Sequence, residues 1–561
     1  MAEYLSPGVY VEEYNSLKMP AIEGVDTCTA GFIGLAEKGP VNEPPVLITS
    51  YTEYVQKFGG YLSAADFGPY RYLAGSVNQF FTNGGTRCYI ARVIPANAVT
   101  AKAVSFSLTV EAANEGAWGN RITLDISKTV CKKMQLIKKQ AEKIYHAKTT
   151  AGFEQGSIVQ FGEEYNRIVT INDNQVMFEH EFSQDIVDER IIPEKYITLT
   201  ELSVRVNSDQ ISELFTEINL NPASPNYIES VMKNSNLVKI KVTPVTELTD
   251  PSKNLLEDFI GSVVLSGGDD GTMDQVNAAV FIGEDKGTGK RTGIQAFLEI
   301  DAVRTMAVPG ITMPEVVRSL ISHCENTGNR FAVIDMPQEM DSITELTNYR
   351  RMIDSSLAAM YHPWIQVFDY CANKHAYFPP SGAVLGVYSK VDLTRGVHKA
   401  PANEVIQCTG LKFNFLKEEQ DLLNPLGINL IRSMPGLGIR IWGARTASSN
   451  LTYRYINVRR LFIYVEESIR VYINSVKNEP NDACLWGRIQ QSVSDFLNTV
   501  WRNGMLAETT PEESYYVKTG HSLMTEDDIL NGRLVIEVGI APCRPAEFMI
   551  FRIQQQMIEN E

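Results

Sequence analysis

The sequence contains no uninterrupted apolar stretch of the ~18 residues that a membrane-spanning helix requires. Its first residues also lack the basic segment followed by an apolar segment that marks a secretory signal peptide. Both absences argue against insertion into a membrane and against export by these signals. We therefore expect a soluble protein with no direct membrane insertion.

Positive charge is in deficit: the 561 residues include 67 Asp and Glu but only 51 Lys and Arg, a net charge of −16. A surface of this sign repels phosphates, so we expect no nucleic-acid partner. The densest basic stretch, from Lys132 to Lys143, has no interleaved aromatic side chains that could stack on bases. We predict that this stretch is the solvent-exposed face of a helix.

The cysteines and histidines are not arranged as a metal site. The eight cysteines run from Cys28 to Cys543 and never form a Cys-x-x-Cys pair, which excludes a zinc-ribbon spacing and indicates reduced, buried thiols. Cys371 and His375 are close in sequence, but two ligands cannot complete a tetrahedral site. We predict no metal.

Signatures of catalysis are missing as well, since the sequence has neither a Gly-x-Ser-x-Gly elbow nor a His-Glu-x-x-His helix. The loop Gly283–Thr292 could cradle a phosphate, but five residues separate Gly283 from Gly289 and Arg291 follows the lysine, whereas a P-loop needs four and then Lys-Ser/Thr. The segment Leu265–Gly271 lacks the alternating carboxylates of a calcium loop and predicts a turn. We predict no catalytic, cofactor-binding or metal-binding residues and no enzymatic activity.

Both ends of the chain have the composition of exposed β-strands. Near the start, a β-branched and aromatic run is separated from the rest of the chain by Pro20. An extended arm of about 14 residues reaches roughly 45 Å at about 3.3 Å per residue, far enough to enter a neighbouring copy. Near the finish, strands Leu534–Ile540 and Glu547–Ile553 flank a proline-bracketed hinge, Ala541–Pro545. Pairing of both ends within one subunit remains the alternative.

Changes in composition divide the chain into four parts. We predict an N-terminal extended arm at 1–20, a core domain formed by 21–127 and 258–403, an inserted β-rich outer domain at 128–257, and a C-terminal domain with a strand arm at 404–561. Alternating strands and helices in the core indicate a doubly wound layer on a mostly parallel sheet. The predicted fold class is α/β and α+β multidomain, with a C-terminal α/β sandwich completed by strands from neighbouring subunits.

Hydrophobic periodicity predicts the main elements. Core strands are expected at Thr29–Leu35, Cys88–Val93, Phe331–Met336 and Trp364–Asp369, core helices at Pro314–Asn326 and Ile343–Met360, and two amphipathic C-terminal helices over Val458–Val476 and Leu485–Val500.

Short motifs in order along nearly the whole chain outside the insert resemble the sheath proteins of contractile phage tails and of phage-derived contractile injection systems. They are Pro7–Glu13, Trp118–Asn120, Arg291–Ala296, Val308–Gly310, Pro379–Ala383, Lys399–Asn403, Gly438–Thr446, Tyr455–Leu461 and Gly539–Phe548.

The resemblance implies a structural subunit of a helical assembly, built from stacked hexameric rings around an inner tube and contracting to drive the tube through an envelope. It implies an inner tube protein, baseplate proteins and terminal cap proteins as partners, assembly in the bacterial cytoplasm, and a phage tail or injection particle that can be released from the cell. In such sheaths the N-terminal strand of one subunit and the C-terminal strand of another join the sheet of a third. The exchanged residues would be Val9, Tyr10, Val11, Glu12 and Glu13 at one end and Phe548, Met549, Ile550, Phe551 and Ile553 at the other.

The resemblance further implies an inner-tube contact on the second C-terminal helix, where Arg488 and Arg502 lie on the polar side, with intramolecular ion pairs as the alternative for both. A type VI secretion sheath is a second reading within the family, although that sheath is usually split into two chains. A nucleotide-binding α/β enzyme using residues 283–292 is the rival from another class.

Overall fold

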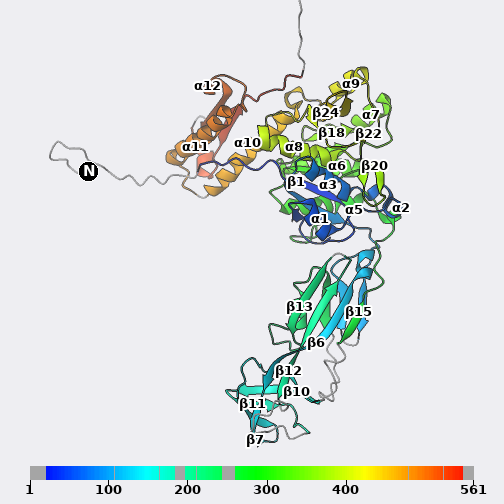
Figure 1. Ribbon diagram of the computed structural model, residues 1–561. Helices are drawn as coiled ribbons and strands as arrows, with labels where there is room; N and C mark the ends of the chain where they lie inside the picture. The colour runs from blue at the N-terminus through cyan, green and yellow to red at the C-terminus, as the bar shows by residue number, and fades with distance from the viewer. Residues whose placement is uncertain are drawn as a thin grey trace, which may run out of the picture.

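The computed structural model of the protein describes residues 21–105, 108–162, 164–183, 196–209, 211–242, 260–477, 479–521 and 523–547. The two strand runs expected to exchange between subunits, Val9–Glu13 and Phe548–Ile553, lie outside these residues. An α/β unit carries a long β-rich insert below it and a smaller C-terminal unit at its side (Figure 1). Within the described ranges, no helix is both long and apolar enough to cross a membrane.

The α/β unit is built on a nine-stranded sheet with the order β2-β3-β1-β16-β17-β18-β23-β24-β21. Neighbours from β3 to β23 pair in parallel, and β2, β24 and β21 pair antiparallel at the two edges. Every residue of β1, β17 and β18 is buried, as expected where helices cover both faces of a parallel sheet. The strands are β1 (Ala30–Leu35), β2 (Val46–Ile48), β3 (Cys88–Val93), β16 (Thr305–Ala307), β17 (Phe331–Asp335), β18 (Ala358–His362), β21 (Glu404–Val405), β23 (Ile428–Met434) and β24 (Gly438–Ile441).

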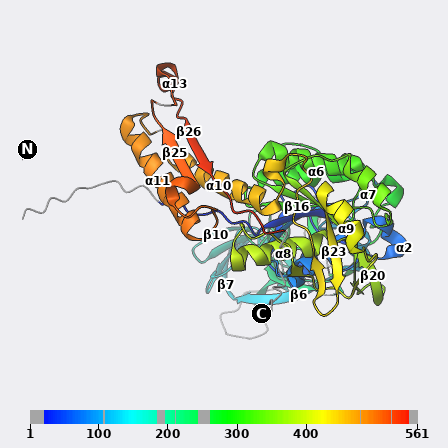
Figure 2. The same ribbon diagram turned by 90° about the horizontal axis from the view of Figure 1, so that it is seen from above.

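Helices lie on both sides of this sheet. Helix α8 (Ser381–Arg395) is on one side, and α6 (Pro314–Thr327) and α7 (Ile343–Arg350) are on the other (Figure 2). Helix α3 (Leu73–Thr82) packs closely against α8. A Cβ at Gly382 of α8 would lie only 2.1 Å from a backbone oxygen of α3, so glycine is what allows the two helices to approach.

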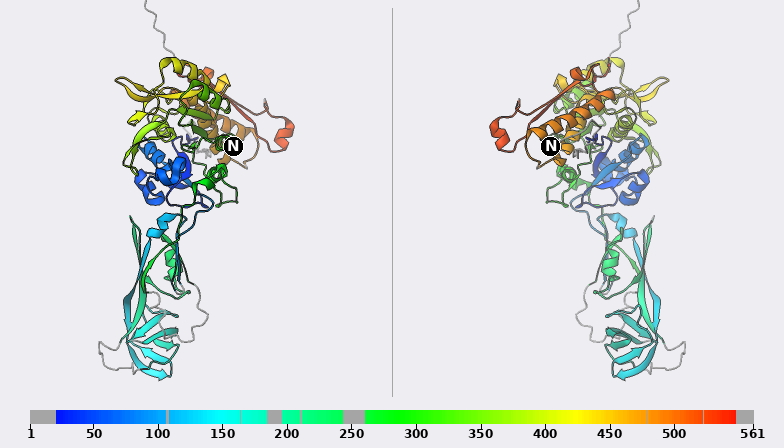
Figure 3. Two further views of the ribbon diagram at one scale, coloured as in Figure 1. Left: turned by 90° about the vertical axis from the view of Figure 1, so that its right-hand side faces the viewer. Right: turned by 90° about the vertical axis from the view of Figure 1, so that its left-hand side faces the viewer.

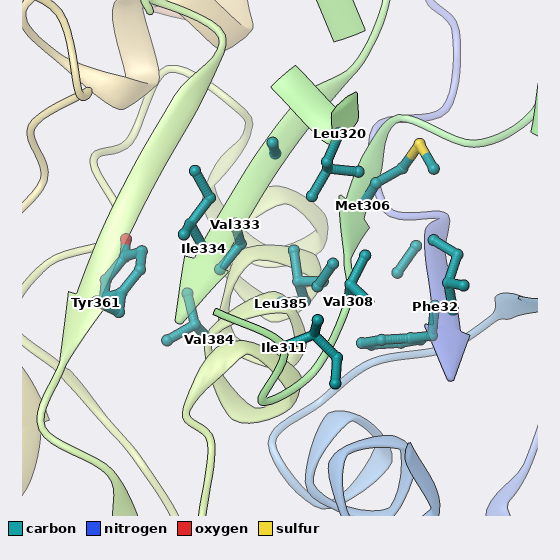
Figure 4. Packing of buried hydrophobic residues seen from close by; sticks show 14 of the residues in the cluster. Phe32, Met306, Val308, Ile311, Leu320, Val333, Ile334, Tyr361, Val384 and Leu385 are labelled. Atoms are coloured by element: carbon teal, nitrogen blue, oxygen red, sulfur yellow. The ribbon is translucent and has the colours of Figure 1, made fainter. Parts of the chain in front are cut away.

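Buried side chains from the parallel strands and the helices form one hydrophobic cluster (Figure 4). Phe32 and Val333 contribute from β1 and β17, and Leu320 and Leu385 from α6 and α8. The cluster continues to Ile428 of β23. The core therefore extends past residue 403, where composition had predicted its end, because β23 pairs with β18.

The insert projects away from the α/β unit (Figure 3). It contains two hydrophobic clusters. Strands β6 (Thr123–Met134) and β12 (Ile197–Asn207) pair along their length and contribute to both clusters. Neighbouring antiparallel strands make up the distal part of the insert, in keeping with the predicted β-rich character. They are β7 (Leu136–Ala141), β8 (Ile144–Ala147), β9 (Ile158–Phe161), β10 (Glu164–Asn172) and β11 (Gln175–Phe178).

The helix predicted over Lys132–Lys143 is wrong, because β6 continues to Met134 and β7 and β8 follow it. Lys138 and Lys139 are exposed on β7, the last strand of its sheet. Lysines on such an edge discourage pairing with other chains. The run of lysines is therefore explained by an edge strand and not by the face of a helix. The boundary predicted at 127 also falls inside β6.

The helix predicted over Ile343–Met360 is correct only in its first half. Helix α7 ends at Arg350, and Ala358–His362 forms the buried strand β18. All five residues of β18 are buried, so they carry no inside–outside periodicity that separates a strand from a helix. The segment predicted as Trp364–Asp369 is strand β19 (Ile365–Asp369), which pairs antiparallel with β20 (Lys374–Phe378) outside the central sheet.

The C-terminal unit contains both predicted long helices, α10 (Ile456–Ser475) and α11 (Ala483–Arg502). Their apolar faces form a separate cluster with strands β25 (Tyr515–Thr519) and β26 (Ile536–Ile540). The unit is thus held together by its own core.

Two buried ion pairs join α10 to the α/β unit. Arg460 donates to both oxygens of Asp392 on α8, at 3.0 and 2.6 Å, and the two side chains are 5% and 1% exposed. Two turns later, Glu467 accepts a hydrogen bond at 3.1 Å from Arg304, which precedes β16. Because buried charges are costly to separate, these pairs make α10 an extension of the α/β unit.

Candidate functional site

The two-stranded sheet β25-β26 is the candidate assembly site. Its strands pair in register from Tyr515 with Ile540 to Thr519 with Ile536. Val517 is buried on the C-terminal cluster, and Ile536, Val538 and Ile540 pack against the same cluster. An isolated pair of strands is marginal in water, so this sheet depends on the helices behind it.

One edge of β26 presents unpaired backbone groups. Ala541 donates its N–H to the Ser514 carbonyl at 2.8 Å, which marks it as a residue that faces β25. Because alternate residues of an antiparallel strand face alternate sides, Ile536, Val538 and Ile540 direct their N–H and C=O groups away from β25. Among the described residues, no strand pairs with β26 on that side. The strand predicted at Leu534–Ile540 is therefore present as β26, which begins two residues later. Among the described strands, β26 pairs only with β25.

The chain that follows β26 is fastened to the rest of the unit. The Ala541 carbonyl accepts from the Ala507 N–H at 2.9 Å, and Cys543 donates its N–H to Met505 at 3.3 Å. Asn457 of α10 donates to the Cys543 carbonyl at 3.1 Å. The segment predicted as a hinge thus follows a defined path across the helices.

This path ends at a carboxylate held by three side chains, which we call the Glu547 socket: Glu547, Arg445, Asn424 and Tyr455. Arg445 donates to both carboxylate oxygens, at 2.9 and 2.7 Å. Asn424 donates to one of them at 2.6 Å, and the Tyr455 hydroxyl donates to the other at 3.1 Å. The Arg445 side chain is only 7% exposed. The socket fixes the point from which the last residues of the chain depart.

The electrostatics of the socket favour the ionised carboxylate. Partial burial acts to raise the pKa of Glu547, but the hydrogen bonds from Arg445, Asn424 and Tyr455 outweigh it and leave that pKa below its ordinary value of 4.5. The contribution of the socket to stability is therefore complete above about pH 4.5 and is lost as the pH falls through the lowered pKa.

Replacing Glu547 by Ala is expected to loosen the segment after β26, because Arg445 is then left buried without its carboxylate partner. The expected cost is about 1–3 kcal/mol, since the pair is partly exposed. Hydrogen exchange of the amides of 541–547 should speed up by about tenfold or more. Glu537→Gln on the exposed face of β26 is the control and should leave these rates unchanged. Equal exchange rates in Glu547→Ala and in the unsubstituted protein would contradict the anchoring role.

The other end of the described chain passes along α10. Val25 donates its N–H to the Ser468 hydroxyl at 3.0 Å, and Ile22 packs on the C-terminal cluster. Asp26 pairs with Arg87 at 3.0 Å before the chain enters β1. Residues 21–25 therefore border α10, whereas Glu547 is held by Tyr455, just before α10, and by Asn424 and Arg445 of the α/β unit.

The two arginines expected to contact an inner tube lie on the outer side of α11. Arg488 is 4.0 Å from Glu479, so part of its charge is neutralised within the chain. Arg502 is exposed and has no ion pair with any residue that the structure describes. Gln490, one of the polar neighbours, donates to the Val517 carbonyl and so belongs to the packing against β25.

The loop Gly283–Thr292 is closed on itself. The Gly287 N–H donates to Asp285 at 3.0 Å, and the Gly289 N–H donates to Glu299 at 2.8 Å. Arg291 bridges the same two carboxylates at 2.8 and 2.7 Å. The backbone donors that a phosphate would need are thus taken by carboxylates, which also repel an anion.

The cysteines do not converge on a site. Cys28, Cys88 and Cys324 are buried and free, whereas Cys371 and Cys484 are exposed, so the expected burial is wrong for these two. His375 contacts Thr409 at 3.2 Å. Over the described ranges, no group of three or more His, Cys, Asp or Glu side chains is arranged to hold a metal ion.

Two family models match consecutive parts of the chain. The model of the phage tail sheath protein central domain matches residues 286–447, and the model of the phage tail sheath C-terminal domain matches residues 448–556. Their junction lies between β24 and α10, where the central sheet gives way to the C-terminal unit.

Curated relatives and solved structures agree with this match. A protein described as a prophage major tail sheath protein of Pseudomonas aeruginosa is 25% identical over 207 residues, covering 35% of this chain and 53% of the relative. The tail sheath protein of Burkholderia phage BcepMu is 27% identical over 162 residues, covering 27% of this chain and 34% of the relative. The chain thus spans about half or less of the length of these relatives.

A contracted PVC sheath complex from an extracellular contractile injection system has a similar fold. It has a TM-score of 0.53 at 21% identity, and the likeness covers 99% of both chains.

Proposed function

We propose, from the matches to both phage tail sheath models and to curated tail sheath proteins, that the chain is a member of the contractile tail sheath family and the structural subunit of a sheath of stacked hexameric rings. The sheath surrounds an inner tube and contracts to drive that tube through a target envelope. The observation that carries the proposal is the open edge of β26, backed by a hydrophobic core and flanked by the segments that lead to both termini.

Strand addition at this edge would join the subunits. A strand from a neighbouring copy, contributed by Val9–Glu13 or Phe548–Ile553, would pair with the outward groups of Ile536, Val538 and Ile540. These three residues offer about six backbone groups, and at about 0.5–1.5 kcal/mol net per bond they would contribute about 3–9 kcal/mol per strand. Such a joint holds neighbours together while their domains rotate.

The contrast between two sheet edges supports this use of β26. The outer strand β7 of the insert carries Lys138 and Lys139, which discourage pairing. The open edge strand β26 has the sequence Ile-Glu-Val-Gly-Ile, with one charge and no lysine. An edge left open in this way is suited to accept a partner strand.

Contraction would use subunits that move largely as rigid bodies. The buried pairs Arg460–Asp392 and Arg304–Glu467 support this, because they join the C-terminal unit to the α/β unit. The strand order also supports a doubly wound core, in which the chain reverses direction at β1 and helices cover both faces. A metastable extended sheath that gains interface on contraction needs no nucleotide, and the closed loop at 283–292 agrees with a non-enzymatic subunit.

The remaining partners follow from the same proposal. The exposed side of α11, with Arg502 at its end, is the surface that we assign to the inner tube. Baseplate and terminal cap proteins would bind the ends of the sheath. Assembly would take place in the bacterial cytoplasm, with the particle acting as a phage tail or as an injection device outside the cell. Both family models lie on one chain, which favours a single-chain sheath over the divided type VI form.

Val538→Pro tests the proposal directly. The substitution removes an N–H from the open edge and spares the hydrogen bonds to β25, so the chain should fold but fail to form tubules. Val538→Thr keeps the N–H and is the matched control. Electron microscopy should show long tubules for the unsubstituted protein and the control, and dispersed particles for Val538→Pro. Normal tubules from Val538→Pro would show that the edge of β26 is not the joint.

A further inference from the structure

A small polar cavity lies in the insert, where its two hydrophobic clusters meet. Its volume is about 50 Å³. Glu201 of β12 lines it between Leu199 of the distal cluster and Leu202 of the proximal one. The loops that carry Glu154 and Asn221 complete the wall. With Lys132 of β6, the cavity therefore touches four segments that are distant in sequence.

Glu201 is the unusual member of this cavity. The residue is only 5% exposed, and its Oε2 atom has no hydrogen-bond partner. A buried carboxylate oxygen without a partner is costly, because it loses its hydration and gains nothing in exchange. A cation or a hydrogen-bond donor in the cavity would remove that cost.

The other polar groups of the cavity are oriented by bonds among themselves. Asn219 donates to the Ser224 hydroxyl at 2.8 Å, and Ser224 lies 3.4 Å from a carboxylate oxygen of Glu154. Asn221 donates to the Gln155 carbonyl at 2.7 Å. These bonds use one amide N–H of each asparagine. Their amide oxygens accept only from backbone N–H groups, of Asn221 and Ala223, and each keeps a lone pair.

The charge balance of the cavity selects the sign of a ligand. Glu154 and Glu201 bring two negative charges and Lys132 one positive charge, so an anion is disfavoured. Lys132 donates to the Gly152 carbonyl at 3.3 Å. A volume of about 50 Å³ is also too small for a sugar, but it suits an ion with one or two waters.

We propose that this cavity binds a hard divalent cation, for which Ca²⁺ is the probe. Carboxylate, amide and hydroxyl oxygens are the ligands that Ca²⁺ prefers, and its coordination is flexible enough to combine several chain segments with water. Glu201 would supply the buried carboxylate and Glu154 the second, with Asn219, Asn221 and Ser224 completing the oxygen set. Sequence spacing gave no sign of this site because its ligands come from three separate segments.

Binding would stiffen the insert at the junction of its clusters. The cation would tie β12 to the loops around Glu154 and Asn221. The proposal is independent of sheath assembly, since it concerns the insert alone.

Calorimetric titration of the full-length protein with CaCl₂, after treatment with a chelator, tests the site. We expect one Ca²⁺ per chain in the unsubstituted protein. Glu201→Gln keeps the size of the side chain and should abolish binding. Lys132→Gln removes a like charge and should tighten binding several-fold. Glu111→Gln, an exposed carboxylate on strand β5 (Leu108–Ala112), is the control and should bind as the unsubstituted protein does.

Glu201→Gln is expected to weaken Ca²⁺ binding, whereas Lys132→Gln is expected to strengthen it. These opposite changes in affinity distinguish a cation site from a carboxylate that has only a structural role. Absence of Ca²⁺ binding at millimolar concentration would overturn the proposal and would mean that the cavity holds only water. Unchanged affinity in Glu201→Gln would overturn it as well. Neither result would affect tubule formation, which is measured separately by microscopy.

Discussion

A chain that lacks Met1–Tyr14 is expected to fold and to remain monomeric. The described clusters begin only at Ile22 and Ala30, so the deletion removes no core residue from any of them. It does remove the arm that we propose to pair with a neighbour. Because each joint in the sheath would need a donated strand, assembly should be lost completely, while circular dichroism should match that of the full-length chain.

A matched variant separates the loss of the strand from the loss of length. Replacing Val9, Tyr10 and Val11 by Gly keeps the arm at full length but removes its β-forming side chains. This variant should also fail to form tubules in electron microscopy. Tubules formed by the deleted chain would contradict strand exchange at the N-terminus, and an unfolded deleted chain would show that the arm belongs to its own subunit.

Replacing Arg460 by Ala should produce the largest loss of stability of any single change discussed above. Asp392 would remain as a buried carboxylate without its arginine partner. The Thr27 carbonyl would also lose the hydrogen bond that it accepts from Arg460. Breaking a buried pair in this way costs about 3–5 kcal/mol. The measurement is urea unfolding followed by tryptophan fluorescence, carried out in the monomeric chain that lacks Met1–Tyr14.

A double variant gives the control for this prediction. Arg460→Met combined with Asp392→Leu removes both charges and fills similar volume, so it should recover most of the lost stability. If Arg460→Ala shifted the unfolding midpoint no more than an exposed substitution such as Arg502→Ala, the pair would not fasten α10 to the α/β unit. In the intact sheath, we expect Arg460→Ala to assemble poorly at temperatures where the monomer begins to unfold.

Much of the fold was predictable from periodicity. Strand β3 has the predicted bounds, α6 differs by one residue, and α10 and α11 follow the predicted apolar spacing. The errors lie where the sequence has no periodicity, or where its pattern fits a helix and a strand equally well. Lys132–Lys143 has a charge pattern that fits either a helix face or edge strands, and Ala358–His362 is buried throughout. Long-range pairing decided both cases.

The candidate site was predictable in part. The strand at Leu534–Ile540 and the proline-bracketed segment after it were evident from the sequence. The Glu547 socket was not, although Arg445 and Glu547 both lie in motifs that carry the family resemblance. Nothing in local sequence indicates that residues 102 positions apart meet.

The sequence by itself determined the local elements, the negative charge, the absence of catalytic motifs and the resemblance to contractile tail sheath proteins. These properties depend on composition and on spacing within a few residues. The tertiary structure decided where the core ends, which edge of β26 stays open, and which charges meet at Asp392 and Glu547. Such contacts join segments far apart along the chain, and their positions depend on how whole elements pack.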